Sequence, residues 1–182
     1  MNTAQLDALK RNNEESRRVT REALLEALYL LIEEKEYKQI KITELCERAG
    51  VSRQAFYRNF SSIDDVLEER VVKIAGEITE GLTADIRQNW IHIFKVMDAD
   101  RNGIHTLLKA DMEHVILKYL NSYLPVNDNA RKIQVIWNGV IYNLIVDWAV
   151  TGKPGDYLEM AELAYQLTKD IPPVDQFVQF HP

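Results

Sequence analysis

The stretch that most limits how this chain can fold is 41–67, KITELCERAGVSRQAFYRNFSSIDDVL, in which a three-residue turn separates two short helices. We expect Thr43 to cap the first helix, 44–49, because its hydroxyl can accept hydrogen bonds from the free amides of the first turn. Gly50 follows at the position where helices commonly end in a left-handed residue. Ser52 is expected to cap the second helix. Two short helices joined by a tight glycine turn have the geometry of a helix-turn-helix, whose second helix enters a DNA major groove.

The second helix carries side chains that suit contact with DNA. Arg53 and Gln54 can pair with the edges of guanine or adenine, and the methyl group of Ala55 can touch a thymine methyl. Phosphate contacts, which set register rather than sequence preference, are within reach of other residues in this stretch. We therefore expect a DNA-binding surface made of Lys41, Thr43, Ser52, Arg53, Gln54, Ala55, Tyr57 and Arg58. The alternative is an ordinary helical hairpin with a polar outer face.

Further landmarks surround the turn. A basic segment, 17–21, leads into an amphipathic helix, and the pair Phe56-Tyr57, then Phe60, then a Ser62-x-x-Asp65 cap follow the turn. Together they resemble the DNA-binding domain of the TetR family of transcriptional regulators over about the first 70 residues. The resemblance implies a homodimer whose all-helical C-terminal domain binds a small effector and changes the spacing of two DNA-reading heads. Family members often carry a lysine directly after the Ser62-type cap, where it can meet a DNA phosphate. This chain has Ile63 at that position, so it has no lysine for this contact.

The whole chain is expected to be all-α. It has 182 residues, seven glycines and five prolines, and it lacks sustained strand-like alternation. We expect a flexible N-terminal arm over 1–15, a three-helix helix-turn-helix DNA-binding domain over 16–61, and a helical effector-binding and dimerisation domain over 62–182. The arm is expected to be disordered, with DNA contact through Lys10 and Arg11 as the alternative.

The distribution of charge matters more than its sum. The net charge of −6 argues at first against nucleic acid, but residues 1–60 hold 11 basic and 10 acidic side chains, whereas 61–182 hold 11 and 18. Within 37–60 five basic residues stand against two acidic ones. Affinity for DNA depends on where cations meet phosphates, so we expect modest and strongly salt-dependent binding to double-stranded DNA.

The second domain is expected to consist of helices with identifiable breaks. After the helix that follows Ser62, the expected helices cover Ile86–Met97, Ile104–Ala110, Met112–Leu124, Arg131–Thr151 and Asp156–Asp170. The segment 131–151 is apolar nearly all round, so it must be buried on more than one side. We expect the subunit interface within about 128–170, where the last two helices would form a four-helix bundle with a second copy. The alternative is that this apolar surface is monomer core.

An effector site is expected between the helices of the second domain. Such sites are mostly apolar, with a few polar groups that fix the orientation of the ligand. The expected lining consists of Trp90, Phe94, Met97, His105, Leu108, Met112, Trp137, Asn138, Ile141, Tyr142 and Trp148. The alternative is that these aromatic residues belong to the core, since Phe and Trp are readily buried.

Other motifs support few further functions. The lone Cys46 excludes an intramolecular disulfide and is expected to be a small buried hydrophobe, with a redox sensor as the alternative. The run 98–103 copies the start of a calcium loop, but the twelfth loop position is Lys109, so we expect a helix–helix turn. The four histidines, His181 included, form no metal pattern. We expect no cofactor and no metal, and an enzyme is disfavoured because we find no clustered acid–base pair.

The sequence also bears on where the protein is located and on its role. No signal peptide is recognisable, and no uncharged apolar run approaches the ~20 residues that cross a bilayer, so we expect a cytoplasmic protein with no membrane partner. The most consistent role is a ligand-responsive repressor that acts as a homodimer on a palindromic operator, with an unknown small-molecule effector. The alternative is a TetR-like protein-binding module or co-activator with weak or no DNA binding.

Overall fold

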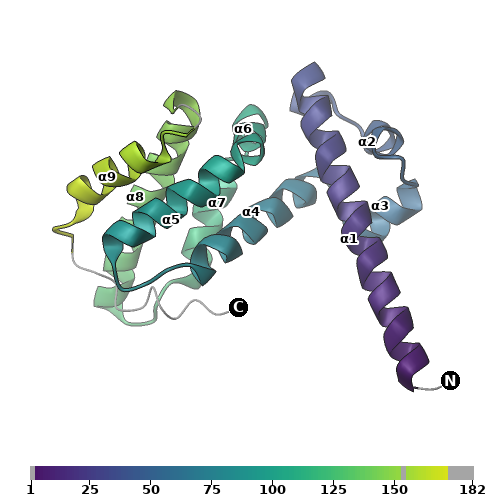
Figure 1. Ribbon diagram of the computed structural model, residues 1–182. Coiled ribbons are helices and arrows are strands. Elements are labelled where there is room, and N and C mark those ends of the chain that lie inside the picture. The colour runs from purple at the N-terminus through teal and green to yellow at the C-terminus, as the bar shows by residue number, and fades with distance from the viewer. Residues whose placement is uncertain (1–2, 153–154, 172–182) are drawn as a thin grey trace. The chain divides into compact units, whose positions relative to one another are not determined.

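The computed structural model describes residues 3–152 and 155–171, and over these residues every element is a helix, which confirms the expected all-α class (Figure 1). The chain forms two compact units, a first unit, Met1–Glu69, and a second unit, Arg70–Pro182. The boundary falls inside helix α4 (Ile63–Glu80), whereas we expected it directly before Ser62.

The first unit is the helix-turn-helix domain. Its elements are α1 (Thr3–Glu34), the 3-10 helix η1 (Tyr37–Gln39), α2 (Ile42–Ala49), α3 (Arg53–Asn59) and the start of α4. α1 packs against both α2 and α3, and Leu24, Leu28, Leu45 and Phe56 are completely buried between these helices. The Phe60 ring, 6.1 Å from that of Phe56, is buried with them, as the four-residue spacing of the two rings predicts.

α1 is longer than the sequence suggested. It begins at Thr3, so residues 3–15, which we expected to form a flexible arm, are helical in the structure. The described side chains from Asp7 to Val19 are exposed, and no core holds this part of the helix. Its flexibility in solution stays a prediction.

The second unit is a bundle around aromatic side chains. After the rest of α4 it contains α5 (Ile86–Ala99), α6 (Arg101–Lys109), α7 (His114–Leu120), the 3-10 helix η2 (Asn121–Tyr123), α8 (Asp128–Thr151) and α9 (Tyr157–Thr168). α5 packs along α9, and the indole N–H of Trp90 donates to Thr168 Oγ1 over 2.8 Å. Trp90, Phe94, Trp137 and Trp148 are buried in the core of this unit.

Side-chain caps explain several of the helix starts. Asp85 accepts from two amides at the start of α5, and Asn127 does the same at the start of α8. The expected break over 98–103 is much shorter in the structure, because Asp100 alone separates α5 from α6. Asp100 accepts from Arg70 on α4, and Asp98 accepts from Arg101, so both carboxylates of the calcium-like motif are paired with arginines.

α8 is notable for its composition. It is the one helix, among the described residues, whose length and composition would allow it to cross a membrane. Of its most apolar segment, 33% is buried. A single such helix is weak evidence for a membrane span, since core helices satisfy the same criteria. The expectation of no membrane partner stays a prediction.

Candidate nucleic-acid interface

The turn before α3 has the conformation that its glycine predicts. Gly50 ends α2 with φ 66°, in the left-handed region, and its amide bonds back to the carbonyls of the last turn. Space does not require glycine here, because an added Cβ would meet nothing within 4 Å; the backbone conformation does. Ser52 then caps α3, with its Oγ accepting from the amide of Ala55 over 3.1 Å. Both assignments from the sequence are confirmed.

The predicted cap of the preceding helix is wrong. α2 begins at Ile42, with the extended residue Lys41 at its N-cap position, so Thr43 lies inside the first turn. A residue with helical backbone angles cannot occupy the cap position, which needs an extended backbone. The 3-10 helix η1 and the buried Ile40 determine where the chain enters α2. Thr43 is exposed and remains part of the predicted surface.

α3 presents two different faces. Phe56 is fully buried against α1 and α2, whereas the neighbouring Tyr57 is 53% exposed, with its ring edge-on to Phe56 at 5.4 Å between centres. Arg53 and Gln54 are exposed at the N-terminal end of the helix. Of the residues predicted to contact DNA, Lys41, Thr43, Ser52, Arg53, Gln54, Tyr57 and Arg58 are exposed and Ala55 is half-buried. The first turn of the helix is therefore open to a partner.

The exposed face of α3 differs from the rest of the first unit in its ion pairing. Elsewhere in the unit several cations meet carboxylates: Arg18 with Glu15 and Glu22, Arg21 with Glu69, Lys35 with Glu44, and Arg48 with Glu34. Within the described part of the chain, Lys41, Arg53 and Arg58 form no ion pair. The positive charge that remains uncompensated around the turn therefore lies on and beside α3.

The C-terminal end of α3 is held by residues that the sequence analysis did not single out. Asn59 donates to the carbonyl of Ala55 and accepts from Arg21 Nε over 3.3 Å. The same guanidinium lies 5.3 Å from the centre of the Phe60 ring. Arg21 was visible only as part of the basic segment 17–21, and its spacing from Asn59 in sequence gave no signal of this contact.

Two further contacts fix the start of α4. Ser62 and Asp65 form the expected capping box: the Asp65 amide donates to Ser62 Oγ over 3.2 Å, and the Ser62 amide donates to Asp65 Oδ2 over 3.1 Å. Hydrogen bonds from the Ser62 side chain and from the Ser61 amide hold the pKa of Asp65 below its usual value. The Tyr37 hydroxyl donates to Asp64. The pKa of Tyr37 is raised, mainly by burial and secondly by this hydrogen bond.

Cys46 lies in α2 with 2% of its surface exposed, and burial raises the pKa of its thiol. Arg53 nearby acts in the opposite direction but does not outweigh burial. A buried thiol with a raised pKa is a poor nucleophile, so the structure favours the packing role for Cys46.

The capped glycine turn, the buried inner face and the uncompensated cationic outer face of α3 define a helix-turn-helix DNA-binding domain. In agreement, residues 22–69 match the family model described as bacterial regulatory proteins, tetR family. The chain thus carries an N-terminal DNA-binding domain of the kind found in TetR-family transcriptional regulators, and the match lies wholly within the first unit. A comparison with curated proteins gives no match.

The residues predicted to line an effector site are mostly packed together in the second unit. Trp90 stacks on Phe94 at 5.8 Å and lies 6.3 Å from Trp137. Buried residues among the eleven are Trp90, Phe94, Met97, Met112, Trp137, Asn138, Ile141 and Trp148; Leu108 and Tyr142 are half-buried and His105 is exposed. Asn138 donates to the carbonyl of Leu120, so this polar group serves the packing of α7 and η2 on α8. The effector site stays a prediction.

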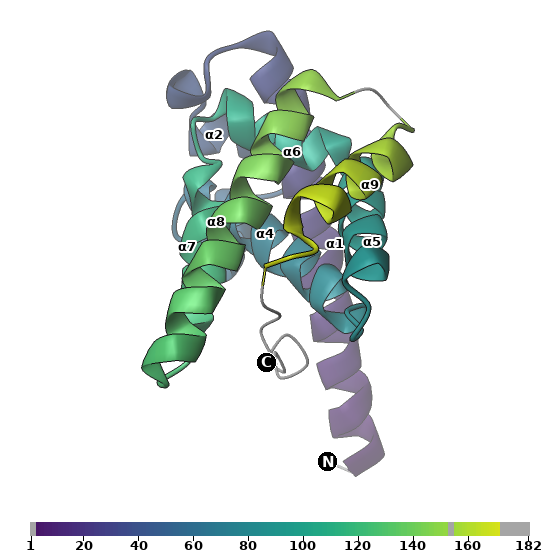
Figure 2. The ribbon, with the colours of Figure 1, turned by 90° about the vertical axis from the view of Figure 1, so that its left-hand side faces the viewer.

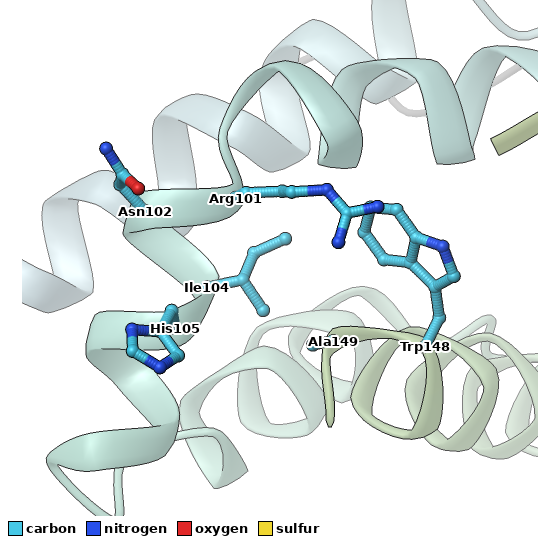
Figure 3. A pocket seen from close by; sticks show the side chains of 6 residues that line it. All are labelled: Arg101, Asn102, Ile104, His105, Trp148 and Ala149. Atoms are coloured by element: carbon cyan, nitrogen blue, oxygen red, sulfur yellow. The ribbon is translucent and has the colours of Figure 1, made fainter. Parts of the chain in front are cut away.

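A pocket of about 160 Å³ lies elsewhere in the same unit, between α6 and α8 (Figure 3). Its lining consists of Arg101, Asn102, Ile104, His105, Trp148 and Ala149, of which His105 and Trp148 belong to the predicted set. Arg101 extends across Trp148, with its guanidinium carbon 4.2 Å from the ring centre, and it also pairs with Asp98 and Asp156. Two carboxylates already neutralise this arginine, so the pocket offers no strong site for an anion.

Proposed function

We propose that this regulator is a homodimeric repressor that inserts α3 of each copy into successive major grooves of a palindromic operator. The observation that supports it best is the uncompensated cationic face of α3, with Arg53 and Gln54 exposed at its N-terminal end. These two side chains read base edges, while Tyr57, Arg58 and Lys41 bind phosphates. Such a dimer would repress transcription where its operator overlaps a promoter.

Dimerisation is supported by apolar surface on the last two helices. α8 and α9 lie next to each other on the side of the second unit that Figure 2 presents. The large apolar side chains of these two helices that are exposed are Val135, Ile136 and Val150 on α8, and Leu158, Leu163 and Leu167 on α9, each at least 45% exposed. Apolar patches of this kind mark interaction surfaces in soluble proteins. A second copy of the same face is the proposed partner, in keeping with the predicted interface at 128–170.

A twofold dimer also suits the proposed DNA target. An interface that uses the same patch on both copies places two identical heads around one axis. A palindrome presents two identical half-sites in the same symmetry, about 34–36 Å or a multiple of that spacing apart. A single head would make half of these contacts and bind far more weakly.

The proposed effector response passes through α4. Two consecutive residues of this helix are paired within different units: Glu69 accepts from Arg21, and Arg70 donates to Asp100. A movement of the Asp100 junction would therefore act directly on the helix that begins at the capped Ser62. The effector shifts the dimer toward a state that no longer fits two major grooves, and it does so only through its differential affinity for the two states.

The size of the described pocket limits which effector can bind. The pocket of about 160 Å³ is smaller than the ~300–1,000 Å³ of typical ligand pockets. A drug-sized effector therefore requires the aromatic core around Trp90 and Trp137 to open, which would create the predicted site. A very small effector fits the existing pocket beside Trp148.

The alternative function is a protein-binding module or co-activator with weak or no DNA binding. It is favoured by Ile63, a half-buried residue at the first position of α4 where the family often has a phosphate-binding lysine. It is also favoured by the small excess of positive charge in residues 1–60, which hold 11 basic and 10 acidic side chains.

The test of the proposed function is selection of duplexes from a random DNA library by the full-length protein, followed by binding assays at two salt concentrations. We expect one palindromic sequence to be enriched and its affinity to fall steeply with salt. Failure to enrich any sequence, with weak and sequence-independent binding at low salt, would contradict the proposal and favour the module.

A further inference from the structure

The N-terminal half of α1 is a helix without a core. Figure 1 shows α1 continuing toward its N-terminus well beyond α2 and α3. The described side chains from Asp7 to Val19 are exposed, and the residues matched to the family begin only at 22. A helix that is polar all round needs another source of stability, such as ion pairs along its surface or a partner.

The register of α1 determines which face this extension turns toward α2 and α3. Residues seven apart lie nearly on one line along a helix. Lys10, Arg17, Leu24 and Leu31 have this spacing. Leu24 and Leu31 are fully buried, and α1 packs on α2 and α3. Lys10 and Arg17 therefore continue, beyond the core, the same side of α1 that holds the reading helix.

The basic residues of the extension differ in their ion pairing. On the side away from the core, Arg18 is held between Glu15 and Glu22 at 2.7 and 2.8 Å. Within the described residues, Lys10 and Arg17 form no ion pair. Lys10 and Arg17 thus lie on one stripe of α1 as cations without an ion pair, with Glu14 about one turn from each of them.

We propose that Lys10 and Arg17 bind DNA phosphates in the sequence that flanks the bases contacted by α3. This proposal rests on the proposed function, since it requires that α3 enters DNA. Fourteen residues of helix separate Lys10 from Leu24, which corresponds to about 21 Å, or about six base pairs of duplex. The extension therefore lengthens the footprint of each head and adds affinity without adding sequence preference.

Lys10 and Arg11 provide a matched comparison. They are neighbours that carry the same charge, but one helical step of 100° separates them, so Arg11 points away from the stripe. We compare full-length wild type with Lys10→Ala, Arg11→Ala and the double variant Lys10→Ala/Arg17→Ala. Alanine keeps the helix propensity high, and circular dichroism checks that each variant retains its helix content.

The measurement is the salt dependence of affinity for the selected duplex, once with long flanks and once trimmed to the bases under α3. With long flanks we expect the slope of log affinity against log salt to fall by about 0.9 for each lost contact, hence by about 3.6 for the double variant in a two-headed dimer. Arg11→Ala is expected to keep the wild-type slope. On the trimmed duplex all four proteins should share one slope.

The outcomes separate this inference from the proposed function. Equal slopes for all variants on the long duplex, with Arg53→Ala still losing base discrimination, would overturn the role of the extension alone. The same loss for Arg11→Ala as for Lys10→Ala would also overturn it, because it would reduce the effect to net charge. If the wild type selects no duplex, both the proposed function and this inference fail, and a protein partner becomes the occupant of the stripe.

Discussion

The two units of this protein bury their cores in the same way but leave opposite kinds of surface exposed. The first unit encloses Phe56 and Leu24 between three helices and leaves cations without carboxylate partners on and beside α3. The second unit encloses three tryptophans and leaves aliphatic side chains of α8 and α9 exposed. Uncompensated cations suit phosphates, whereas exposed leucines and valines suit another apolar face.

This contrast shows where the information about function lies. In both units the buried residues explain the fold, and the surface that lacks a partner within the chain indicates what the unit binds. The net charge of −6 would mislead, because the surplus of acidic side chains belongs to residues 61–182. The following predictions test whether the two surfaces are independent.

The largest effect is expected from Phe56→Ala, which empties a fully buried site in the first unit. Such truncations cost about 3–5 kcal/mol. All three tryptophans lie in the second unit, so their fluorescence reports that unit, whereas circular dichroism reports both. We expect denaturant unfolding followed by circular dichroism to shift to lower denaturant while the fluorescence transition stays in place. The matched variant Phe94→Ala should shift the fluorescence transition; equal shifts by both probes for Phe56→Ala would contradict two separable cores.

The next effect concerns the apolar face of the second unit. Leu163 and Leu167 are 49% and 65% exposed, so glutamates there should leave the fold of a single copy intact. In the proposed dimer they would bury uncompensated charges, at a cost on the order of 3 kcal/mol or more. We expect Leu163→Glu/Leu167→Glu to sediment as a monomer at concentrations where the wild type is a dimer. Val72→Glu, at a site 51% exposed on α4, should remain dimeric; a dimeric double variant would place the interface elsewhere.

Arg53→Ala tests base reading by the first unit. Removing a bidentate contact should cost ~1–3 kcal/mol of discrimination between the selected duplex and a mismatched one. Tyr57→Phe should weaken binding to all duplexes about equally, because its proposed contact is to phosphate. Competition binding with specific and random DNA measures both. An equal loss on the two DNAs for Arg53→Ala would remove its assigned role.

Ser52→Ala removes the cap of α3 and leaves its amide donor at Ala55 without this partner. The expected loss of stability is about 1 kcal/mol, read from the circular dichroism transition of the first unit. Thr43→Ala is the matched control, because Thr43 lies inside the first turn of α2 and caps nothing. A loss for Thr43→Ala as large as that for Ser52→Ala would contradict the observed start of α2.

How much the sequence predicts depends on how local the cause is. Gly50, Ser52 and the Ser62–Asp65 capping box were predicted correctly, because each of their hydrogen bonds joins residues at most four apart in the sequence. Thr43 was assigned wrongly since the start of α2 depends on the packing of Ile40.

The candidate sites follow the same rule. The exposed face of α3 could be predicted from a short motif, and the structure adds the absence of carboxylate partners among the described residues. The bond from Arg21 to Asn59 joins residues 38 apart and had no local signal. The aromatic residues of α5 and α8 recur at a spacing that is the same for a core and for a pocket. The contact between the rings of Trp90 and Trp137 could therefore be learned only from the packed structure.

The smallest effect is a pH dependence at the start of α4. Because hydrogen bonds lower the pKa of folded Asp65 below its ordinary 3.8, its contribution to stability is present above that value and is lost as the pH falls through the folded pKa. We expect Asp65→Asn to show a shallower decline in stability below about pH 4 than the wild type. Parallel declines for the two proteins would show that this carboxylate is not held by its cap.

The most direct test of the central claim is site-directed DNA cleavage from position 54, at the exposed start of α3. An iron chelate attached to Gln54→Cys in a Cys46→Ala background cuts the DNA closest to that residue. The account predicts two equal clusters of cuts in the major groove of the selected duplex, placed symmetrically and about one helical turn or a multiple of it apart. A single cluster, or cleavage spread without position along the duplex, would contradict the insertion of two α3 helices into one palindrome.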